Sequence, residues 1–213
     1  MDTKHAYNLR KQEQLISRFQ CFGELDANAQ YEVLLCADVP DNDNPSRVIY
    51  YGQPGHVFLV LNKIPFPGDT ISQSFGLYPL HMFWSLSFHK IRSKIGNNEK
   101  REYDIRLSKS LSAWEFARLL EQAVQLSAHK YHIKKYNCMQ FALDLFNTVS
   151  DIQLSANTVR FPFLVGKGGS PCAVYEKLKD LKTTGSPLAE SIRIDSLQSP
   201  ANSCPVNSPL TIH

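Results

Sequence analysis

Apolar residues recur at helical spacing in four segments of the chain, and each segment predicts an amphipathic helix. Ser112 and Glu115 have the spacing of a capping box and mark where one of these helices starts. The first helix should end at Gly23 and pack on the outside of the domain. The four predicted helices span residues 5–22, 112–127, 138–149 and 171–181.

Shorter apolar runs bounded by turn residues predict β-strands. Residues 31–39 form a compact apolar run, which indicates a buried strand with Cys36 in the core. Residues 55–61 form a second strand that His56 opens, and the alternating residues 70–78 predict its hairpin partner. Two further short strands are expected over residues 47–51 and 102–107.

Strands come mainly before helices along the chain, which predicts an α+β fold, an antiparallel sheet with helices packed on one side. Residues 31–182 should form this domain, preceded by an N-terminal helical extension over residues 1–30. Residues 183–213 are rich in Ser, Pro, Asn and Thr and poor in apolar residues, so we expect a disordered tail. Removing that tail should leave the fold intact.

The overall composition narrows the classes of partner. The net charge of +3 is small and scattered, and no basic run is interleaved with aromatic residues, which argues against nucleic acid. No apolar stretch reaches the roughly 18 residues of a membrane span. The N-terminal residues lack the apolar region of a Sec signal peptide. We therefore expect a cytoplasmic protein, or one exported without a Sec signal peptide.

The five cysteines are odd in number, irregularly spaced and without a CxxC motif. This pattern argues against a disulfide framework and against a Cys-rich zinc site. A reducing compartment is the simplest interpretation. The sequence indicates no metal and no cofactor.

Cys138 is the main candidate for chemistry, because it stands where a loop becomes a helix. Asn137 is a good N-cap residue, and Gln140 has the spacing to complete a capping box. A thiol in the first turn meets unpaired backbone N–H groups and the positive end of the helix dipole, which favour the thiolate. Lys134 and Lys135 add positive charge upstream. The ordinary alternative is a small buried hydrophobic residue that begins a core helix.

A cysteine nucleophile needs a basic partner, which is usually distant in sequence and adjacent in the fold. His56 is the candidate, because it opens a strand after Gly55 and so lies at an end of the sheet. The first residue of a strand is accessible there, and active sites collect at such ends. Cys138 and His56 are therefore predicted to lie side by side.

Other residue groups carry weaker signals. Cys172 also lies near a helix start, after Ser170 and Pro171, but has no matched histidine motif. His129 and His132 with Cys138 are a poor match to a zinc site.

Residues 166–169 lack the GxxxxGK[ST] context of a phosphate loop and are better interpreted as a lid or wall of a cleft. His81, His89 and the aromatic residues Phe83 and Trp84 could line the rim of a cleft, although packing is the favoured interpretation.

Three motifs together resemble those of a known superfamily. They are Gly55-His56-Val57-Phe58, the stretch 73–79 with sequence QSFGLYP, and the stretch 136–142 with sequence YNCMQFA. In this order they are similar to the "GHxF … FGxYP … NCxxF" pattern of circularly permuted papain-like proteins. These include the permuted NlpC/P60 group, the lecithin-retinol acyltransferase-like proteins and little-characterised bacterial domains. The resemblance covers about residues 31–181.

The resemblance implies a role for each matching residue. Cys138 would be the nucleophile and His56 the general base. A third polar residue on the strand after the histidine strand would orient the imidazole, with Gln73 first and Ser72 or Ser74 next. The Cys138 backbone N–H would stabilise an oxyanion, aided by the Asn137 or Tyr136 side chain. The acyltransferase branch has a histidine at the third place, from which this chain departs.

The leading hypothesis is therefore a cysteine hydrolase, an amidase or peptidase that cleaves an amide bond through a thioester. Its substrate would be a peptide, peptidoglycan or protein, as for a bacterial effector, and a partner or inhibitor protein is a further expectation. One alternative is a non-catalytic binding module on the same fold. Another is a lipid acyltransferase, which should carry a membrane anchor that the sequence does not show.

Overall fold

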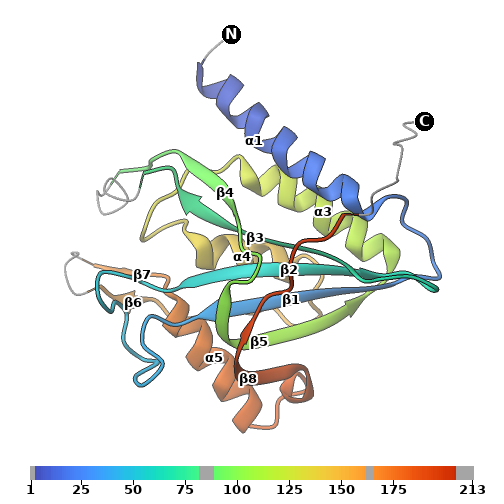
Figure 1. The fold of residues 1–213 in the computed structure, drawn as a ribbon. Coiled ribbons are helices and arrows are strands. Elements are labelled where there is room, and N and C mark those ends of the chain that lie inside the picture. Colours follow the sequence, from blue (N-terminus) through green and yellow to red (C-terminus); the bar gives the residue numbers. More distant parts are fainter. Residues whose placement is uncertain (1–2, 82–88, 162–165, 205–213) are drawn as a thin grey trace.

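The computed structural model describes residues 3–81, 89–161 and 166–204. The fold is α+β, with a six-stranded antiparallel sheet whose strand order is β4-β3-β2-β1-β5-β8. Four α-helices occur within these ranges (Figure 1). The sequence prediction of an antiparallel α+β fold is confirmed at this level.

The elements follow one another as a strand-rich half and a helix-rich half. The sheet strands are β1 (Gln30–Asp38), β2 (His56–Ile64), β3 (Ile71–Pro79), β4 (Ser93–Asn97), β5 (Glu102–Leu111) and β8 (Ile192–Gln198). The helices are α1 (Thr3–Phe19), η1 (Gln20–Phe22), α3 (Ala113–Ser127), α4 (Cys138–Asn147), α5 (Pro171–Thr183) and η2 (Ala189–Ser191). A separate two-stranded ribbon pairs β6 (Val159–Arg160) with β7 (Lys167–Gly168).

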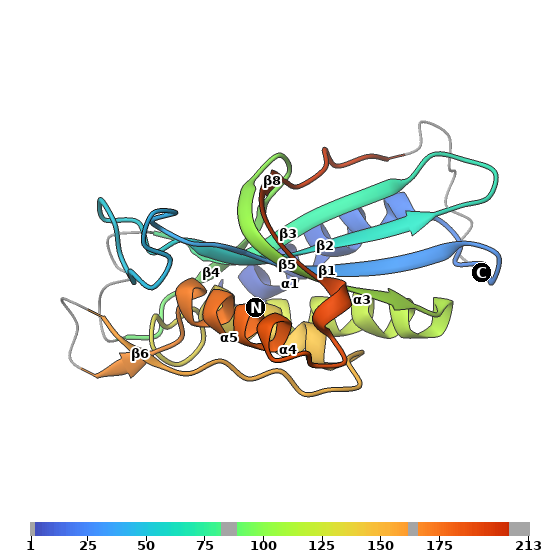
Figure 2. The same ribbon diagram turned by 90° about the horizontal axis from the view of Figure 1, so that it is seen from below.

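The central strands β1 and β2 are buried on both faces of the sheet. The main core lies on the face covered by α3, α4 and α5, and includes Leu35, Leu59 and Phe75 (Figure 2). A smaller apolar cluster, with Cys36 and Phe58 among its members, occupies the opposite face. There β5 curls over the sheet and its pairing with β8 shifts register (Figure 2). Burial on both faces explains why the runs that predicted β1 and β2 are almost continuously apolar.

The N-terminal helix is part of the core, which corrects the expectation of an extension packed on the outside. Its amphipathic face packs against α3 and β4, and Leu15 and Phe22 are each only 1% exposed. The ring of Phe19 meets that of Phe75 on β3 at a centroid distance of 5.4 Å. The helix was predicted from its apolar spacing, but that spacing does not reveal how deeply it packs.

The expected disordered tail is wrong for the residues up to 204. Strand β8 pairs with β5 and completes the sheet, and Ile192 is fully buried. The other six residues of β8 are exposed, so apolar periodicity is nearly absent. Backbone hydrogen bonds to β5 hold this edge strand, and composition does not report them.

After β8 the chain crosses to the opposite edge region and runs beside β3. Asn202 accepts the backbone N–H of Ser74 at 2.8 Å, and Ser203 accepts that of Ser72 at 2.8 Å. Cys204 then forms a disulfide with Cys21, which corrects the expectation that the cysteines are all reduced. Two cysteines that lie 183 residues apart become neighbours only because the tail packs.

Two smaller differences concern strands. Residues 47–51 form no strand, since Tyr50 makes only an isolated bridge to Gln53 across a tight turn. Strand β4 falls in a polar segment between the predicted strands 70–78 and 102–107, where no strand was expected. The helices at Ser112 and Asn137 start as predicted, and both capping boxes are present.

The packing of β8 predicts unequal effects of two substitutions on one strand. Ile192→Ala should lower the free energy of unfolding by about 2–4 kcal/mol, because it leaves a cavity under the sheet. Ile194→Ala is the matched control, since Ile194 is 41% exposed and should cost less than about 1 kcal/mol. Urea unfolding of both variants measures the difference. Equal small losses would mean that β8 does not pack on the domain.

Candidate functional site

The first turn of α4 holds Cys138 in a closely bonded setting. Asn137 is the N-cap, and its Oδ1 accepts the Met139 backbone N–H at 2.9 Å. The two amide protons of Asn137 are donated to the carbonyls of Ile133 and Gly169, at 2.7 and 2.8 Å. Asn137 therefore supports the loop and the helix start. It has no proton left for an oxyanion, which corrects that part of its expected role.

The sheet opens where α4 begins. The pairing of β2 with β3 ends at Leu59 and Phe75. From Phe75 to Pro79, β3 pairs with β4 (Figure 1). Val57 lies beyond the end of this ladder. Its backbone N–H donates to the Cys138 sulfur, and Val57 has no partner on β3. The thiol therefore lies against the residue that follows His56.

His56 is 3% exposed and is held by aromatic stacking. Its ring stacks on that of Tyr78 with centroids 4.1 Å apart and planes 26° apart. Nε2 of His56 and Oδ1 of Asn98 both lie beside Gly76, where a Cβ would stand 2.5 and 3.0 Å from them. Both atoms are buried, and neither has a hydrogen-bond partner among the described residues. Asn98 therefore presents the acceptor that faces Nε2, close enough to act on the pKa of His56.

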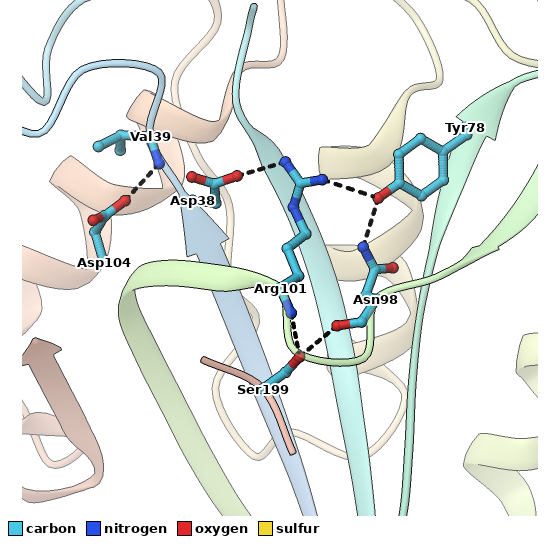
Figure 3. A network of polar contacts seen from close by, with 7 residues as sticks. All are labelled: Asp38, Val39, Tyr78, Asn98, Arg101, Asp104 and Ser199. Atoms are coloured by element: carbon cyan, nitrogen blue, oxygen red, sulfur yellow. Dashed lines mark hydrogen bonds and ion pairs between the residues drawn. The ribbon is translucent and has the colours of Figure 1, made fainter. Parts of the chain in front are cut away.

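A polar network fixes Asn98 and joins it to the half-buried guanidinium of Arg101 (Figure 3). The Asn98 side chain donates to the Tyr78 hydroxyl at 2.5 Å, and Arg101 donates to the same hydroxyl at 3.4 Å. Arg101 also forms an ion pair with Asp38 at 2.5 Å. Ser199, after β8, donates to the Asn98 carbonyl and accepts the Arg101 backbone N–H. The C-terminal segment thus holds the turn that carries Asn98.

Burial dominates the electrostatics of the pair. It raises the pKa of Cys138, against the backbone N–H groups of Val57 and Met139 and the charge of Arg101, which lower that pKa. It holds the pKa of His56 well below 6.5, and the Arg101 charge lowers it further, whereas Asn98 raises it. The expectation that the helix start would favour the thiolate is therefore outweighed. At pH 7 the resting site holds a neutral thiol and a neutral imidazole.

The structure does not bring Gln73 to His56. Gln73 pairs with Leu61, five residues along β2 from His56, and its amide donates to the Ser203 carbonyl at 2.9 Å. That separation is about 17 Å at the rise of a β-strand. Ser72 and Ser74 lie in the same part of β3, bonded to Asn62 and Asn202. None of the three can orient the imidazole, and the expectation fails because the neighbouring strand leaves β2 before it reaches His56.

Tyr136 also lies away from the thiol. Its ring meets His129 edge to face at 4.5 Å, and burial and the charge of Asp144 raise the pKa of its hydroxyl. Asp144 is six residues along α4 from Cys138, or about 9 Å along the helix axis. Tyr136 therefore faces the side of α4, and the expected contribution to an oxyanion site is not supported by its position.

The weaker candidates take structural positions. Cys172 is buried with its sulfur 3.1 Å from the Ser170 hydroxyl. His132 accepts the Lys134 backbone N–H through Nδ1. Within the described ranges, no three His, Cys, Asp or Glu side chains gather closely enough to hold a metal ion.

The Gly-rich segment forms a wall against α4. A Cβ on Gly169 would lie 2.4 Å from the Met139 side chain and 2.5 Å from that of Gln140, so a larger residue there would displace the ends of both side chains. His81 and His89 are exposed, against the favoured packing interpretation. Phe83 and Trp84 lie outside the described residues.

Sequence reasoning missed Asn98 and Arg101. Both lie on the turn that follows β4, in a polar segment where no strand was expected. The available signal was Tyr78 in the FGLYP motif, because a buried tyrosine hydroxyl needs polar partners.

The depressed pKa of His56 predicts how stability depends on pH. As pH falls through 6.5, the unfolded chain binds a proton at His56 before the folded chain does. The contribution of His56 to stability is therefore complete above pH 6.5. It is lost below that, at up to about 1.4 kcal/mol per pH unit.

His56→Gln removes this contribution, so its free energy of unfolding should change less than that of the wild type between pH 7.5 and 5. Urea unfolding at several pH values compares the two proteins. Parallel curves would show that His56 titrates normally in the folded chain.

In the described residues no helix is long and apolar enough to cross a membrane. Comparison with protein-family models, curated proteins and solved structures found no match. The geometry of the site is therefore the evidence for the function.

Proposed function

We propose that the chain is a cysteine hydrolase with a circularly permuted papain-like fold, in which Cys138 is the nucleophile and His56 the base. One observation carries the proposal. The Cys138 sulfur, at a helix N-terminus, accepts the N–H of Val57, the residue next to His56, while Asn98 lies beside Nε2 of that imidazole. A thiol, a base that takes its proton and an acceptor that orients the base together form a relay for nucleophilic catalysis.

The relay supports an amide cleavage in two steps. With Nε2–H directed at Asn98, the unprotonated Nδ1 takes the Cys138 proton as the sulfur attacks the carbonyl carbon. The oxyanion accepts the Cys138 backbone N–H at the start of α4. When the C–N bond breaks, the imidazolium returns its proton to the leaving amine and a thioester forms. Water, deprotonated by His56, then hydrolyses the thioester and frees the thiol.

The neutral resting pair fits general-base catalysis. Burial leaves the thiol protonated and the imidazole unprotonated, so the base is ready to accept a proton at neutral pH. Arg101 lies close enough to lower the pKa of Cys138, and its charge favours the thiolate that forms during attack. The Asp38 ion pair fixes this charge in place.

The order of the elements supports the permuted form of the fold. The histidine strand β2 precedes the cysteine helix α4 in the chain, and α4 packs on β2 and β3. The orienting position is filled by Asn98, on the turn after β4. An asparagine there gives less support to the acyltransferase alternative, which would carry a histidine.

A non-catalytic module is the second candidate, and one observation favours it. Cys138 is 7% exposed and His56 3%, so both are covered and neither carries a charge. A core Cys and His would look the same. Acyl transfer to the thiol separates the two candidates.

Acetylation by p-nitrophenyl acetate tests the nucleophile without knowledge of the substrate. The wild type should form an acetyl thioester at Cys138 and release p-nitrophenol over many turnovers. Cys138→Ser should keep the fold and lose at least about 100-fold in turnover, since a hydroxyl ionises far less readily than a thiol. Cys36→Ser is the matched control, because Cys36 is fully buried on the other face of the sheet. Peptide mapping that finds no acetyl group on Cys138 would favour the non-catalytic module.

A second pair of variants tests the orienting residue. Asn98→Ala should slow turnover roughly tenfold or more, because the imidazole loses the acceptor that fixes its tautomer. Asn98→Asp, which keeps an acceptor oxygen, should restore part of that loss. Gln73→Ala should leave turnover unchanged, since Gln73 lies far from His56 along the sheet. A larger defect in Gln73→Ala than in Asn98→Ala would reverse the assignment.

A further inference from the structure

Two adjoining pockets form a groove between α1, the start of β4 and the loop that leads into α4. The smaller, of about 140 Å³, lies between Tyr7, Lys11 and Ser93. The larger, of about 520 Å³, extends along the loop to Lys135 and Tyr136. Asn8, His129 and Lys130 line both pockets, so the two are continuous. We call this surface the basic groove.

The basic groove is lined by cations without carboxylates. Its five cationic side chains are Lys11, Lys90, Arg92, Lys130 and Lys135, and no Asp or Glu lines either pocket. None of the five forms an ion pair with another described residue. Asp144 acts on the groove only through its interaction with His129 and Tyr136. The groove therefore gathers positive charge on a chain whose net charge is only +3.

The gathered positive charge is least favourable at the most buried cation of the groove, Lys11. Lys11 is 4% exposed and donates to the Ser93 hydroxyl at 2.8 Å, with no acid beside it. Burial lowers its pKa to about 8. His132, in the larger pocket, has its pKa lowered by burial and then by the charges of Lys135, Lys134 and Lys90. A bound anion would offset this positive potential.

We propose that the basic groove binds an acidic segment of a polypeptide substrate whose cleaved bond is held at Cys138. The proposal rests on the proposed function. Lys135 is three residues from Cys138, so their Cα atoms lie within about 11 Å, the reach of an extended chain of that length. A peptide with acidic residues on one side of its cleaved bond could occupy the groove while the bond reaches the thiol.

The aromatic residues of the groove favour a polypeptide over a single-stranded nucleic acid. Base binding uses open aromatic faces as stacking platforms. The face of Tyr7 is already covered by the Arg92 guanidinium at 5.1 Å, and Tyr136 is engaged with His129. Carboxylates on an extended peptide need only the lysine ammonium groups, which are exposed along the groove at positions 90, 130 and 135.

Fluorescence anisotropy with a labelled hexaglutamate peptide tests the proposal on Cys138→Ser, which cannot cleave the probe. Binding should weaken about tenfold in Lys130→Glu/Lys135→Glu and should also weaken as salt rises from 20 to 200 mM. Arg118→Glu/Lys179→Glu, which changes the net charge equally on exposed faces of α3 and α5, is the matched control and should bind as Cys138→Ser does.

Three outcomes would overturn the proposal. The first is binding of hexaglutamate no tighter than that of hexaglutamine. The second is an equal loss of affinity in the two double variants, which would show a net-charge effect. Competition by 10 mM inorganic phosphate as complete as that by unlabelled hexaglutamate would assign the groove to a small oxyanion. None of these results bears on acetylation of Cys138, so failure of the groove and failure of the hydrolase can be told apart.

Discussion

The parting of β3 from β2 is the constraint on which the site depends. Beyond Leu59 and Phe75 the two strands no longer pair, so the backbone N–H of Val57 has no partner on β3. The sulfur of Cys138 takes that N–H. Two glycines leave room for the aromatic rings where the strands part. A Cβ on Gly76 would meet the His56 ring, and one on Gly96 would meet the Tyr78 ring. The FGLYP motif is thus explained by the space that His56 and Tyr78 require.

The same arrangement sets a balance between burial and charge. A helix N-terminus, three backbone N–H groups and Arg101 all favour a thiolate, but removal of the thiol from water outweighs them. His56 is kept neutral by the same burial. The site is therefore poised for proton transfer during attack and holds no ion pair at rest. Arg101 is held in turn by Asp38, Tyr78 and Ser199. The site therefore depends on the segment that follows β8.

The sequence could predict elements whose evidence is local. The capping boxes at Ser112 and Asn137 and the apolar runs of β1 and β2 depend on near neighbours, and they were predicted close to their observed bounds. The placement of Cys138 at a helix start and of His56 at a strand start followed from the same signals.

Long-range pairing could not be predicted in this way. Strand β8 has one buried residue in seven, so only its pairing with β5 reveals it. Gln73 was chosen because it lies on the strand next to His56, and a change of strand partner after Phe75 gave that position to Asn98. Sequence alone shows neither the point where a strand changes partner nor the burial that sets a pKa.

A crystal structure of the chain treated with a peptide aldehyde would test the central claim most directly, because an aldehyde traps a nucleophilic thiol as a hemithioacetal. If Cys138 is the nucleophile, its sulfur should carry a covalent bond to the aldehyde carbon, with the new hydroxyl oxygen on the Cys138 backbone N–H. The His56 ring should lie within hydrogen-bond distance of the adduct, with its Nε2 bonded to Asn98. An unmodified Cys138, or an adduct that His56 does not contact, would contradict it.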